Sequence, residues 1–465
     1  MKKSLLSTLT LLAGTTASAQ ISLEKVFDTN MLIPDGSGDT FVGIDEPPSL
    51  SNGTVLAAIE LPPTPISFFV EGMFSIAPDG TIVEYFRTDD PFPDGNGTID
   101  RNATHGYDIS DGNVVFSPAR NTREMETIVT VFDGVFTTVV ENGVTPIPGG
   151  NGDLFINLAT SVPVPLSGQN FVFEDAGLFD VAGTSGIYAY IDGALVTIAR
   201  AGDASPDGST FSDNDFDEPD IDGTNIVFEA STGFSSDDIY AVFEGSSFPV
   251  VTEADIIPGT TNSRFAFGNN PQISGSSIVF QGGSGNGVSG LYLAEVTNLG
   301  VDSLARVFEE GDAVPDRPGL TFSDLFEFGI GDNGDLVVFE CKFDDDKEEG
   351  IFAYYQGELI NVIDSTQSLD GKSIDFVDME GEGIDGKQFA FEVNFTDGTD
   401  AIYIATIPVD TCTADVNNDG EVTPADFNAW VLAFNNGAPE CDQNGDGNCT
   451  PADFNAWVLN FNNGC

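Results

Sequence analysis

The chain has 465 residues, of which 75 are Asp or Glu and 15 are Lys or Arg, so its formal net charge is −60. A surface this acidic repels phosphate backbones and anionic lipids, which argues against nucleic acids and membrane surfaces as partners. The 52 glycines and 38 phenylalanines favour many short strands joined by tight turns, and the length is ample for one large core beside a small second domain.

Residues 1–19 are predicted to be a signal peptide. A short basic start, Met1-Lys2-Lys3, precedes a Leu-, Thr- and Ala-rich run, and Ala17-Ser18-Ala19 fits the small-residue rule for signal peptidase. The run is shorter than the roughly 18 apolar residues that a spanning helix needs, and no later segment offers them, so a membrane anchor is the weaker alternative. We therefore expect export to the cell exterior or surface, with a mature chain that begins at Gln20.

A repeat with a period of about 56 residues follows. At seven places a small polar residue and a glycine precede a hydrophobic strand, and the glycines are Gly53, Gly112, Gly168, Gly223, Gly275, Gly334 and Gly386. Asn-Gly and Asp-Gly supply the positive φ angles of a two-residue hairpin turn, so strands are expected on both sides of each glycine.

Each period also carries a third and a fourth strand in the same order. In the third period, for example, GIYAY (186–190) is followed by LVTIAR (195–200) and then by a loop around Pro206. Four antiparallel strands per period are typical of a propeller blade. The prediction is an all-β seven-bladed propeller over residues 20–408, with six or eight blades or another repeat array as the alternatives.

The phase of the repeat predicts how the ring closes. LEKVFD (23–28) matches a fourth strand but comes before any first strand, and AIYIAT (401–406) is a third strand with no fourth after it. The N-terminal strand can therefore complete the last blade, which removes two exposed sheet edges.

The ring shows no catalytic constellation in its sequence. His105 is the single histidine and precedes a strand, so we expect it to be solvated or packed in a loop. The acidic run FSDNDFDEPDID (211–222) is placed in a loop between blades, with a calcium site as the less favoured interpretation. Cys341 is expected to be a packed thiol. Acids are too abundant for a carboxylate pair to be informative.

The C-terminal segment, residues 409–465, holds two near-copies of one acidic loop. Alternate side chains of such a loop can converge on Ca²⁺, a hard ion that takes six to eight oxygen ligands, and Gly420 and Gly447 supply the sharp bend. Two calcium ions are therefore predicted as cofactors. The predicted ligands are Asp415, Asn417, Asp419, Glu421, Thr423 and Asp426 in the first loop, and Asp442, Asn444, Asp446, Asn448, Thr450 and Asp453 in the second.

Each loop runs into TPADFNAWVL, which predicts a helix with one apolar face. Phe427, Trp430, Val431 and Phe434 share that face in the first copy, and their equivalents repeat it, so the two helices can pack together. So small a core needs metal and disulfides. Cys412, Cys441, Cys449 and Cys465 allow three pairings, of which we favour Cys412–Cys465 with Cys441–Cys449.

Residues 412–465 resemble a dockerin, a duplicated calcium-loop module similar to half-EF-hands, and most closely the type that ends in Gly-Cys, here Gly464-Cys465. The resemblance implies a cohesin-like or other cell-surface anchoring partner. In cellulosomal dockerins, loop positions 10 and 11 help to choose the cohesin; here they are Pro424-Ala425 and Pro451-Ala452, and only PVDT (408–411) separates ring from tail.

Two functions follow from these observations. The first is a non-catalytic propeller for recognition or structural display, with a glycan or protein ligand, held at the cell exterior by its calcium-binding tail. The alternative is a secreted polysaccharide-degrading enzyme, a glycoside hydrolase or lyase. We favour the first, because the repeats are similar all round the ring and the tail is the most specialised segment.

Overall fold

The computed structural model describes residues 21–63, 70–92, 95, 97–99, 106–120, 125–158, 163–177, 185–212, 216–232, 238–284, 289–344, 347–407, 414–417, 422–444 and 448–463. The chain divides into one compact unit from Leu23 to Thr406 and a second that contains Ile407–Cys465. The predicted signal peptide and the predicted domain boundary after Pro408 lie outside the described residues and stay predictions.

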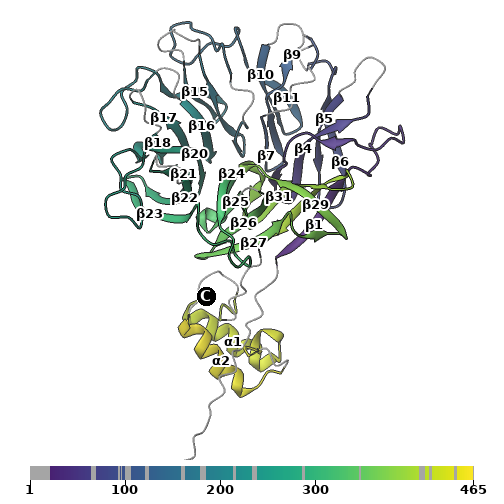
Figure 1. The fold of residues 1–465 in the computed structure, drawn as a ribbon, viewed down its shortest axis with the longest axis vertical. Helices are drawn as coiled ribbons and strands as arrows, with labels where there is room; N and C mark the ends of the chain where they lie inside the picture. Colours follow the sequence, from purple (N-terminus) through teal and green to yellow (C-terminus); the bar gives the residue numbers. More distant parts are fainter. Residues whose placement is uncertain are drawn as a thin grey trace, which may run out of the picture. The chain divides into compact units, whose positions relative to one another are not determined.

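The first unit is a seven-bladed propeller, as predicted (Figure 1). Within the described residues its strands form seven antiparallel sheets, one per blade. Blade 1 contains β2 (Gly43–Ile44), β3 (Ser49–Ser51), β4 (Thr54–Leu61), β5 (Val70–Ile76) and β6 (Ile82–Arg87). Blade 2 contains β7 (Tyr107–Ser110), β8 (Asn113–Phe116), β9 (Ala119–Arg120), β10 (Met125–Phe132) and β11 (Val135–Glu141). Blade 3 contains β12 (Leu166–Ser167), β13 (Asn170–Asp175), β14 (Gly186–Ile191) and β15 (Ala194–Arg200).

Blades 4 to 7 repeat the order of four strands from the centre of the ring outward. They contain β16 (Phe216–Asp222), β17 (Asn225–Ala230), β18 (Asp238–Phe243) and β19 (Ser246–Val251); β20 (Phe267–Ser274), β21 (Ser277–Gly283), β22 (Ser289–Thr297) and β23 (Gly300–Glu309); β24 (Phe322–Gly331), β25 (Leu336–Phe343), β26 (Glu348–Tyr355) and β27 (Glu358–Asp364); and β28 (Ser368–Leu369), β29 (Lys372–Asp378), β30 (Ile384–Asp385), β31 (Gln388–Phe395), β32 (Asp400–Thr406) and β1 (Ser22–Asp28). Two 3-10 turns, η1 (Asp332–Gly334) and η2 (Gly381–Gly383), interrupt the last two blades.

The hairpin turns lie where the glycine register predicts them. All seven repeat glycines separate the innermost strand of a blade from the second strand, and their φ angles fall between 56° and 98°. An L-residue with a side chain is disfavoured at such angles, so the small polar–Gly pair fixes where each blade begins.

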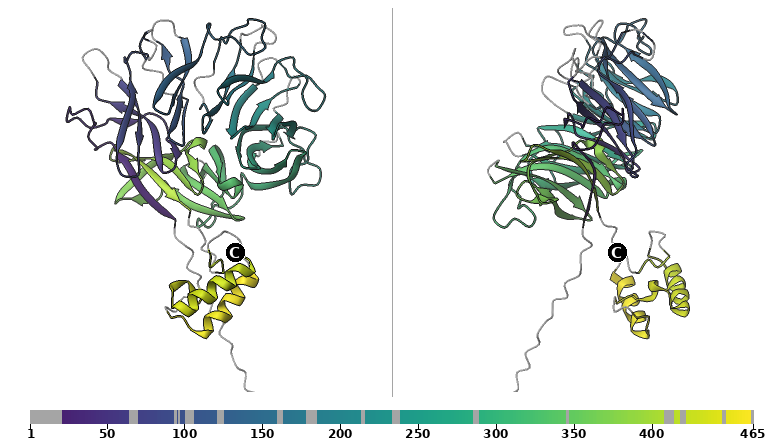
Figure 2. Two further views of the ribbon diagram at one scale, coloured as in Figure 1. Left: turned by 180° about the vertical axis from the view of Figure 1, so that it is seen from behind. Right: turned by 90° about the vertical axis from the view of Figure 1, so that its right-hand side faces the viewer.

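The ring closes through the N-terminal strand, as the phase of the repeat predicts. β1 is the outermost strand of blade 7 and pairs with β32, and the Thr29 N–H donates to the Asp400 carbonyl at 3.1 Å. Figures 1 and 2 show this purple strand beside the yellow-green strands of the last blade. The Phe27 side chain is buried and its ring lies 5.0 Å from that of Phe41.

Stacked aromatic pairs form a repeated part of the core. A second-strand Phe stacks on a third-strand Tyr or Phe with centroids 5.7 to 6.0 Å apart in five blades; the pairs are Phe173–Tyr188, Phe228–Tyr240, Phe280–Tyr292, Phe339–Phe352 and Phe391–Tyr403. Each pair spans two antiparallel strands, so it stabilises the sheet as well as burying apolar area.

The second unit contains two helices, α1 (Pro424–Asn436) and α2 (Pro451–Asn463), and a 3-10 turn, η3 (Pro439–Cys441). Thr423 caps α1 in a capping box with Asp426, and Pro424 occupies the first turn, where its missing N–H costs nothing. Aromatic rings of the two helices meet, with Phe427 5.3 Å from Trp457 and Trp430 5.5 Å from Phe454.

The apolar helix face is less completely buried than predicted. The Trp430 and Trp457 side chains are buried, but Phe427 and Phe454 keep 38% and 40% of their surface exposed, and Val431 is 36% exposed. Two short helices present too little surface to cover four large side chains each. The disulfide predicted between Cys441 and Cys449 is present, whereas Cys412 and Cys465 lie outside the described residues.

Removing β1 is expected to destabilise the ring. Deletion of residues 20–30 leaves blade 7 one strand short, and Phe27→Ala alone is expected to lower the free energy of unfolding by about 3–5 kcal/mol, because it leaves a cavity beside Phe41. Chemical denaturation of the full chain measures this effect. Glu24→Ala, on an exposed position of the same strand, is the control and should change stability by less than about 0.5 kcal/mol. Equal stability of the wild-type and deleted chains would contradict closure by β1.

Candidate functional site

The innermost strands of all seven blades line a central channel. Its cavity has a volume of about 380 Å³. Each strand contributes one aliphatic residue close to its turn glycine, and these are Leu50, Ile109, Leu166, Ile221, Ile273, Ile330 and Ile384. The sequence carries this pattern as a Leu or Ile two to four residues before each repeat glycine, a signal that the glycine register alone did not use.

Neighbouring innermost strands are joined by hydrogen bonds from backbone to side chain. The side chain next to the turn of one blade accepts a backbone N–H from the turn of the next. The pairs are Ser51 with Asp111 (3.0 Å), Ser110 with Gly168 (2.8 Å), Ser167 with Gly223 (2.8 Å), Asp222 with Gly275 (2.7 Å) and, closing blade 7 onto blade 1, Asp385 with Asn52. These bonds hold the channel wall together between blades.

Two carboxylates repeat this linkage deeper in the channel. One Asp108 oxygen accepts the Leu166 N–H at 2.7 Å, and one Asp220 oxygen accepts the Ile273 N–H at 2.7 Å. Burial raises the pKa of Asp108 to about 7 and that of Asp220 to about 6, although these hydrogen bonds oppose the shift.

One end of the channel is acidic. A second cavity of about 170 Å³ there is lined by Glu218, Glu327, Glu380 and Glu382, together with prolines of the innermost strands. Burial raises the pKa of Glu218 and of Glu327 to about 7, and raises the pKa values of Glu380 and Glu382 well above the ordinary range. None of the described residues that line this cavity or the main channel cavity is basic.

Two β-bulges aim polar side chains at this end. Glu218 and Asn270 each precede a proline in a bulged innermost strand and have φ angles of 44° and 49°. A positive φ is strained for such residues and persists at positions that the surrounding structure over-determines. The Asn270 backbone N–H bonds to the Glu218 carboxylate, and the Asn270 side chain bonds to the Glu327 carboxylate. One Glu218 oxygen is buried without a hydrogen bond.

Carboxyl groups also meet between blades at this end. Glu340 of β25 faces Asp378 of β29, and Glu174 of β13 faces Asp217 of β16. Burial raises the pKa of Glu174 to about 9, with a smaller contribution from repulsion by Asp217. Burial also raises the pKa of Glu340, with a smaller contribution from repulsion by Asp378. Glu340 is only 6% exposed and its Oε2 atom has no hydrogen-bond partner. Such pairs hold a proton at neutral pH.

The tail repeats one arrangement in both of its copies. Asp453 is buried and accepts N–H bonds from Gln443 (3.1 Å), Asn444 (3.3 Å) and Thr450 (2.6 Å), and the bond from Thr450 is the main reason that its pKa is lowered. In the first copy Asp426 accepts from Asn417 (3.2 Å) and Thr423 (2.8 Å); burial opposes these bonds, but the pKa of Asp426 is still lowered. Both carboxylates are therefore fixed in the ionised form that a cation binds.

The two indole groups connect each helix to the opposite loop. Trp430 Nε1–H donates to the Cys441 carbonyl at 3.1 Å, and Trp457 Nε1–H donates to the Ala414 carbonyl at 3.2 Å. Each acceptor immediately precedes the first predicted ligand of its loop, Asp442 or Asp415. The position of each loop thus depends on the other helix.

Some predicted ligands fall outside the described residues, namely Asp419, Glu421 and Asp446, as do Gly420 and Gly447. Among the residues that are described, no group of three His, Cys, Asp or Glu side chains could hold a metal ion. That finding does not reach the complete loops, so both calcium sites stay predictions.

The ring residues singled out by sequence have mixed outcomes. His105 lies outside the described residues. Cys341 is a buried free thiol, as expected, and burial raises its pKa. The placement of 211–222 in a loop was wrong for its second half, because Phe216–Asp222 forms β16, with a bulge where Glu218 and Pro219 leave the regular pairing. None of the helices in the described parts of the chain has the length and apolar character needed to cross a bilayer.

The fold and the channel define a seven-bladed propeller with an acidic channel mouth. The sequence matches a family of unknown function, DUF7453, over residues 139–410, more than half of its length, and the chain belongs to this family. No curated protein matches it.

Several solved propellers are similar to this chain. One is from a study of two prolyl endopeptidases, with a TM-score of 0.45 and 13% identity over 80% of this chain. A second is the propeller domain of the Trilobed protease from Pyrococcus furiosus, with a TM-score of 0.34 and 10% identity, covering 71% of this chain and 100% of that one. A third is an oligogalacturonate lyase in complex with manganese, with a TM-score of 0.44 and 10% identity, covering 84% of this chain and 97% of that one. This chain spans 52% of the length of the prolyl endopeptidase.

The buried acids predict a dependence of stability on pH. A carboxyl whose pKa is raised by folding binds more protons in the native state than in the unfolded state, so stability falls as pH rises from the ordinary pKa, near 4.5, through the raised value. Glu340→Gln replaces the acid with a neutral isostere. It should raise the free energy of unfolding by roughly 1–3 kcal/mol at pH 8 and by little at pH 5.

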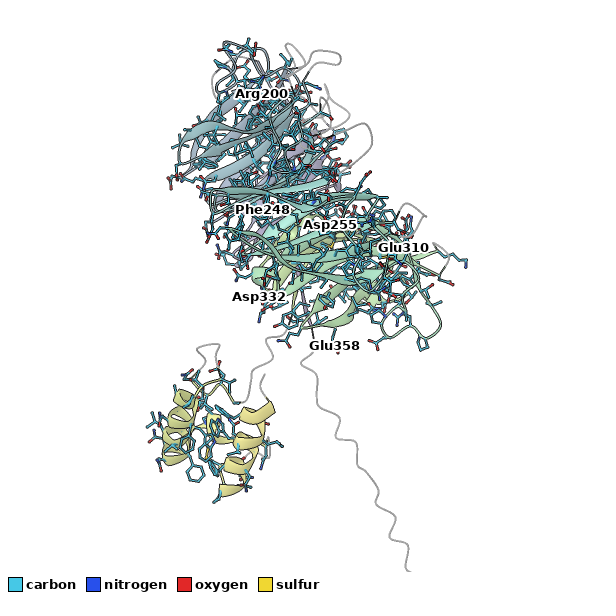
Figure 3. The ribbon with its side chains drawn as sticks, turned by 90° about the vertical axis from the view of Figure 1, so that its left-hand side faces the viewer. Arg200, Phe248, Asp255, Glu310, Asp332 and Glu358 are labelled. Atoms are coloured by element: carbon cyan, nitrogen blue, oxygen red, sulfur yellow. A yellow bond between two sulfur atoms is a disulfide. The ribbon has the colours of Figure 1, made fainter. Side chains whose placement is uncertain are left out.

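Urea denaturation at both pH values measures the difference. Glu358→Gln is the matched control, because Glu358 (Figure 3) is exposed on β27 and the chemical change is the same. A gain that is equal for the two variants would assign the effect to overall charge instead of to the buried pair.

Proposed function

We propose that this protein is an exported, non-catalytic propeller for recognition or display, attached at the cell exterior by a tail that binds two calcium ions. The observation that carries the proposal is the duplicated arrangement of Asp426 and Asp453, each buried, ionised and hydrogen-bonded to backbone N–H groups of its own loop.

The chemistry of the tail suits calcium. The residues that would hold the first ion are Asp415, Asn417, Asp419, Thr423 and Asp426 with the carbonyl of Glu421; the second ion would take Asp442, Asn444, Asp446, Thr450 and Asp453 with the carbonyl of Asn448. A bound cation would offset the repulsion among carboxylates in each loop, so binding and folding of the tail are expected to be coupled.

Calcium titration of the full chain tests the tail. Isothermal titration should show two sites that Asp415→Ala/Asp442→Ala removes together, whereas either single substitution should remove one and weaken the other, since each helix holds the opposite loop. Glu440→Ala is the control, an exposed acid just before the second loop. Retention of both sites in the double variant would contradict the assignment.

The same double variant tests attachment. A cell-surface partner that needs the folded tail should no longer retain it, so the variant should move from the cell fraction to the medium while Glu440→Ala stays cell-bound. Equal retention of the two variants would exclude the tail as the anchor.

A polysaccharide-degrading enzyme is the second candidate, and the acidic channel mouth favours it. A carboxyl with a pKa near 7, as burial gives Glu218 and Glu327, can donate or accept a proton at neutral pH. A glycan array with the full chain, followed by hydrolysis and elimination assays on each bound glycan, separates the two candidates. We expect binding without turnover. Turnover that Glu218→Gln lowers by a hundredfold or more, with binding kept, would establish the enzyme instead.

A further inference from the structure

A groove lies at the outer part of the ring, between the outermost strands of blades 4 and 5. Its volume is about 940 Å³, and its lining comes from the end of β19, the loop after it, the start of β18 and from β23, together with Thr232 and with Asp207 of the loop after β15. Figure 3 labels Phe248 on β19 and Asp255 in the loop that follows. Because neighbouring strands are antiparallel, β16 and β18 begin at the same end of blade 4, so Asp238 lies at the end of the blade that carries the acidic channel mouth.

Asp238, in this groove, breaks the repeat. The position compared is the one two residues before the aromatic residue of the third strand, which is Tyr240 in blade 4. It holds Asp238 in blade 4, and Gly186, Gly290 and Gly350 in blades 3, 5 and 6. A Cβ atom on these glycines would lie 2.4, 2.4 and 2.8 Å from the backbone oxygens of Ala199, Phe308 and Ile363 in the adjacent outermost strand. Blades 3, 5 and 6 therefore have no room for a side chain here.

Blade 4 makes room because its outermost strand ends early. In blades 3, 5 and 6 the glycine itself pairs with a residue of the fourth strand, whereas in blade 4 the last pair is Ile239 with Val251. The Thr252 N–H then bonds to Asp255 at 2.9 Å, as the equivalent N–H groups bond to Asp203 in blade 3 and to Asp312 in blade 5. The space that the early end of β19 opens is the groove, and Asp238 lies in it.

Two buried polar groups, the Asp238 carboxylate and the Tyr240 hydroxyl, lie together at the floor of the groove. Asp238 is 5% exposed, and one of its oxygens accepts a single long bond from the Glu253 N–H at 3.3 Å. Tyr240 beside it is fully buried, and its hydroxyl lies next to Asp238 and Thr232 but makes no hydrogen bond of good geometry. The equivalent hydroxyls of Tyr292 and Tyr403 donate to carboxylates at 2.9 Å.

Tyr188 in blade 3 also lacks a hydrogen bond at its hydroxyl, but Arg200 lies beside it. Among the described residues, the Tyr240 hydroxyl is the one of the two that lies beside a carboxylate lining a groove, so it can be satisfied by a group that enters the groove.

The charges and the wall of the groove define the ligand. Four carboxylates, those of Asp207, Asp238, Glu253 and Asp255, line it against one guanidinium, that of Arg264. The wall is apolar and includes Ile256 and Val301, which are 47% and 37% exposed, together with Pro249 and Leu304. An acidic floor beside an apolar wall matches a basic side chain, which carries its charge at the end of an aliphatic stem.

We propose that this groove binds a lysine or arginine side chain of an extended peptide, with Asp238 accepting hydrogen bonds from the cationic group. A peptide is favoured over a free amine because β19 and β23 are the outermost strands of the described sheets, so their edges can add an extended segment. The proposal rests on the recognition role proposed for the ring and names its ligand class.

Fluorescence anisotropy with a labelled alternating Lys-Leu hexapeptide and the full chain tests the proposal at physiological ionic strength, where the long-range field of the acidic surface is largely screened. Asp238→Asn should weaken binding about tenfold or more, because it removes one charge-assisted contact. Asp302→Asn, an exposed acid of β23 outside the lining, should change affinity by less than about threefold. An equal loss in both variants, or none in either, would overturn the proposal.

Two further arms remove ambiguity. Asp238→Gly restores the residue of the other blades and should weaken binding as much as Asp238→Asn, which covers the case in which one variant fails to fold. A wild-type chain that binds an array glycan but not the Lys-Leu peptide would overturn the groove proposal alone. A chain that binds neither would overturn the recognition role as well.

Discussion

The hydrogen bonds between innermost strands are the constraint on which the ring depends. The described strands of adjacent blades belong to separate sheets, so the wall of the channel is joined by side chains such as Ser110 and Asp222, each accepting an N–H from the next turn. Pairing of β1 with β32 completes the last blade, and the bond from Asn52 to Asp385 joins that blade to the first. With the ring closed, its seven innermost strands are held facing one another, and every polar group on them must find a partner in the channel or meet a ligand there.

This geometry changes the meaning of the net charge. The formal value of −60 counts every acid as ionised, but burial raises the pKa values of Glu174, Glu340 and Glu380. Groups of this kind hold protons at neutral pH, because several carboxylates that face one another without a nearby cation cannot all ionise. The acidic composition therefore has two parts: a solvated surface charge, and a smaller set at one end of the ring whose protonation depends on what approaches it.

The sequence was sufficient for the architecture because the repeat signals are local. An Asn-Gly or Asp-Gly turn needs only its own φ angles, and an N-terminal strand without a partner can be recognised from the order of motifs. The channel mouth was not predictable in the same way. Glu218 and Glu327 are unremarkable acids in the sequence, and they come together only through bulges in β16 and β24. The acidic run 211–222 was assigned to a loop, but its second half is β16, in which Pro219 lies at a bulge, a position where a strand tolerates proline.

Departures from the repeat carry more functional information than the repeat itself. Several blades need glycine at the position of Asp238, because the backbone of the next strand packs against it. Blade 4 has a buried carboxylate there instead, and it lacks one strand pair and carries the desolvation cost of the acid. Sequence comparison within the chain can locate Asp238 as the exception, but it cannot show that β19 ends early to admit it. That step requires the structure, because the space for a side chain is set by the neighbouring strand and not by the residue. The long Glu253 N–H bond offsets this cost only weakly, and this is the physical ground on which a ligand is proposed for Asp238.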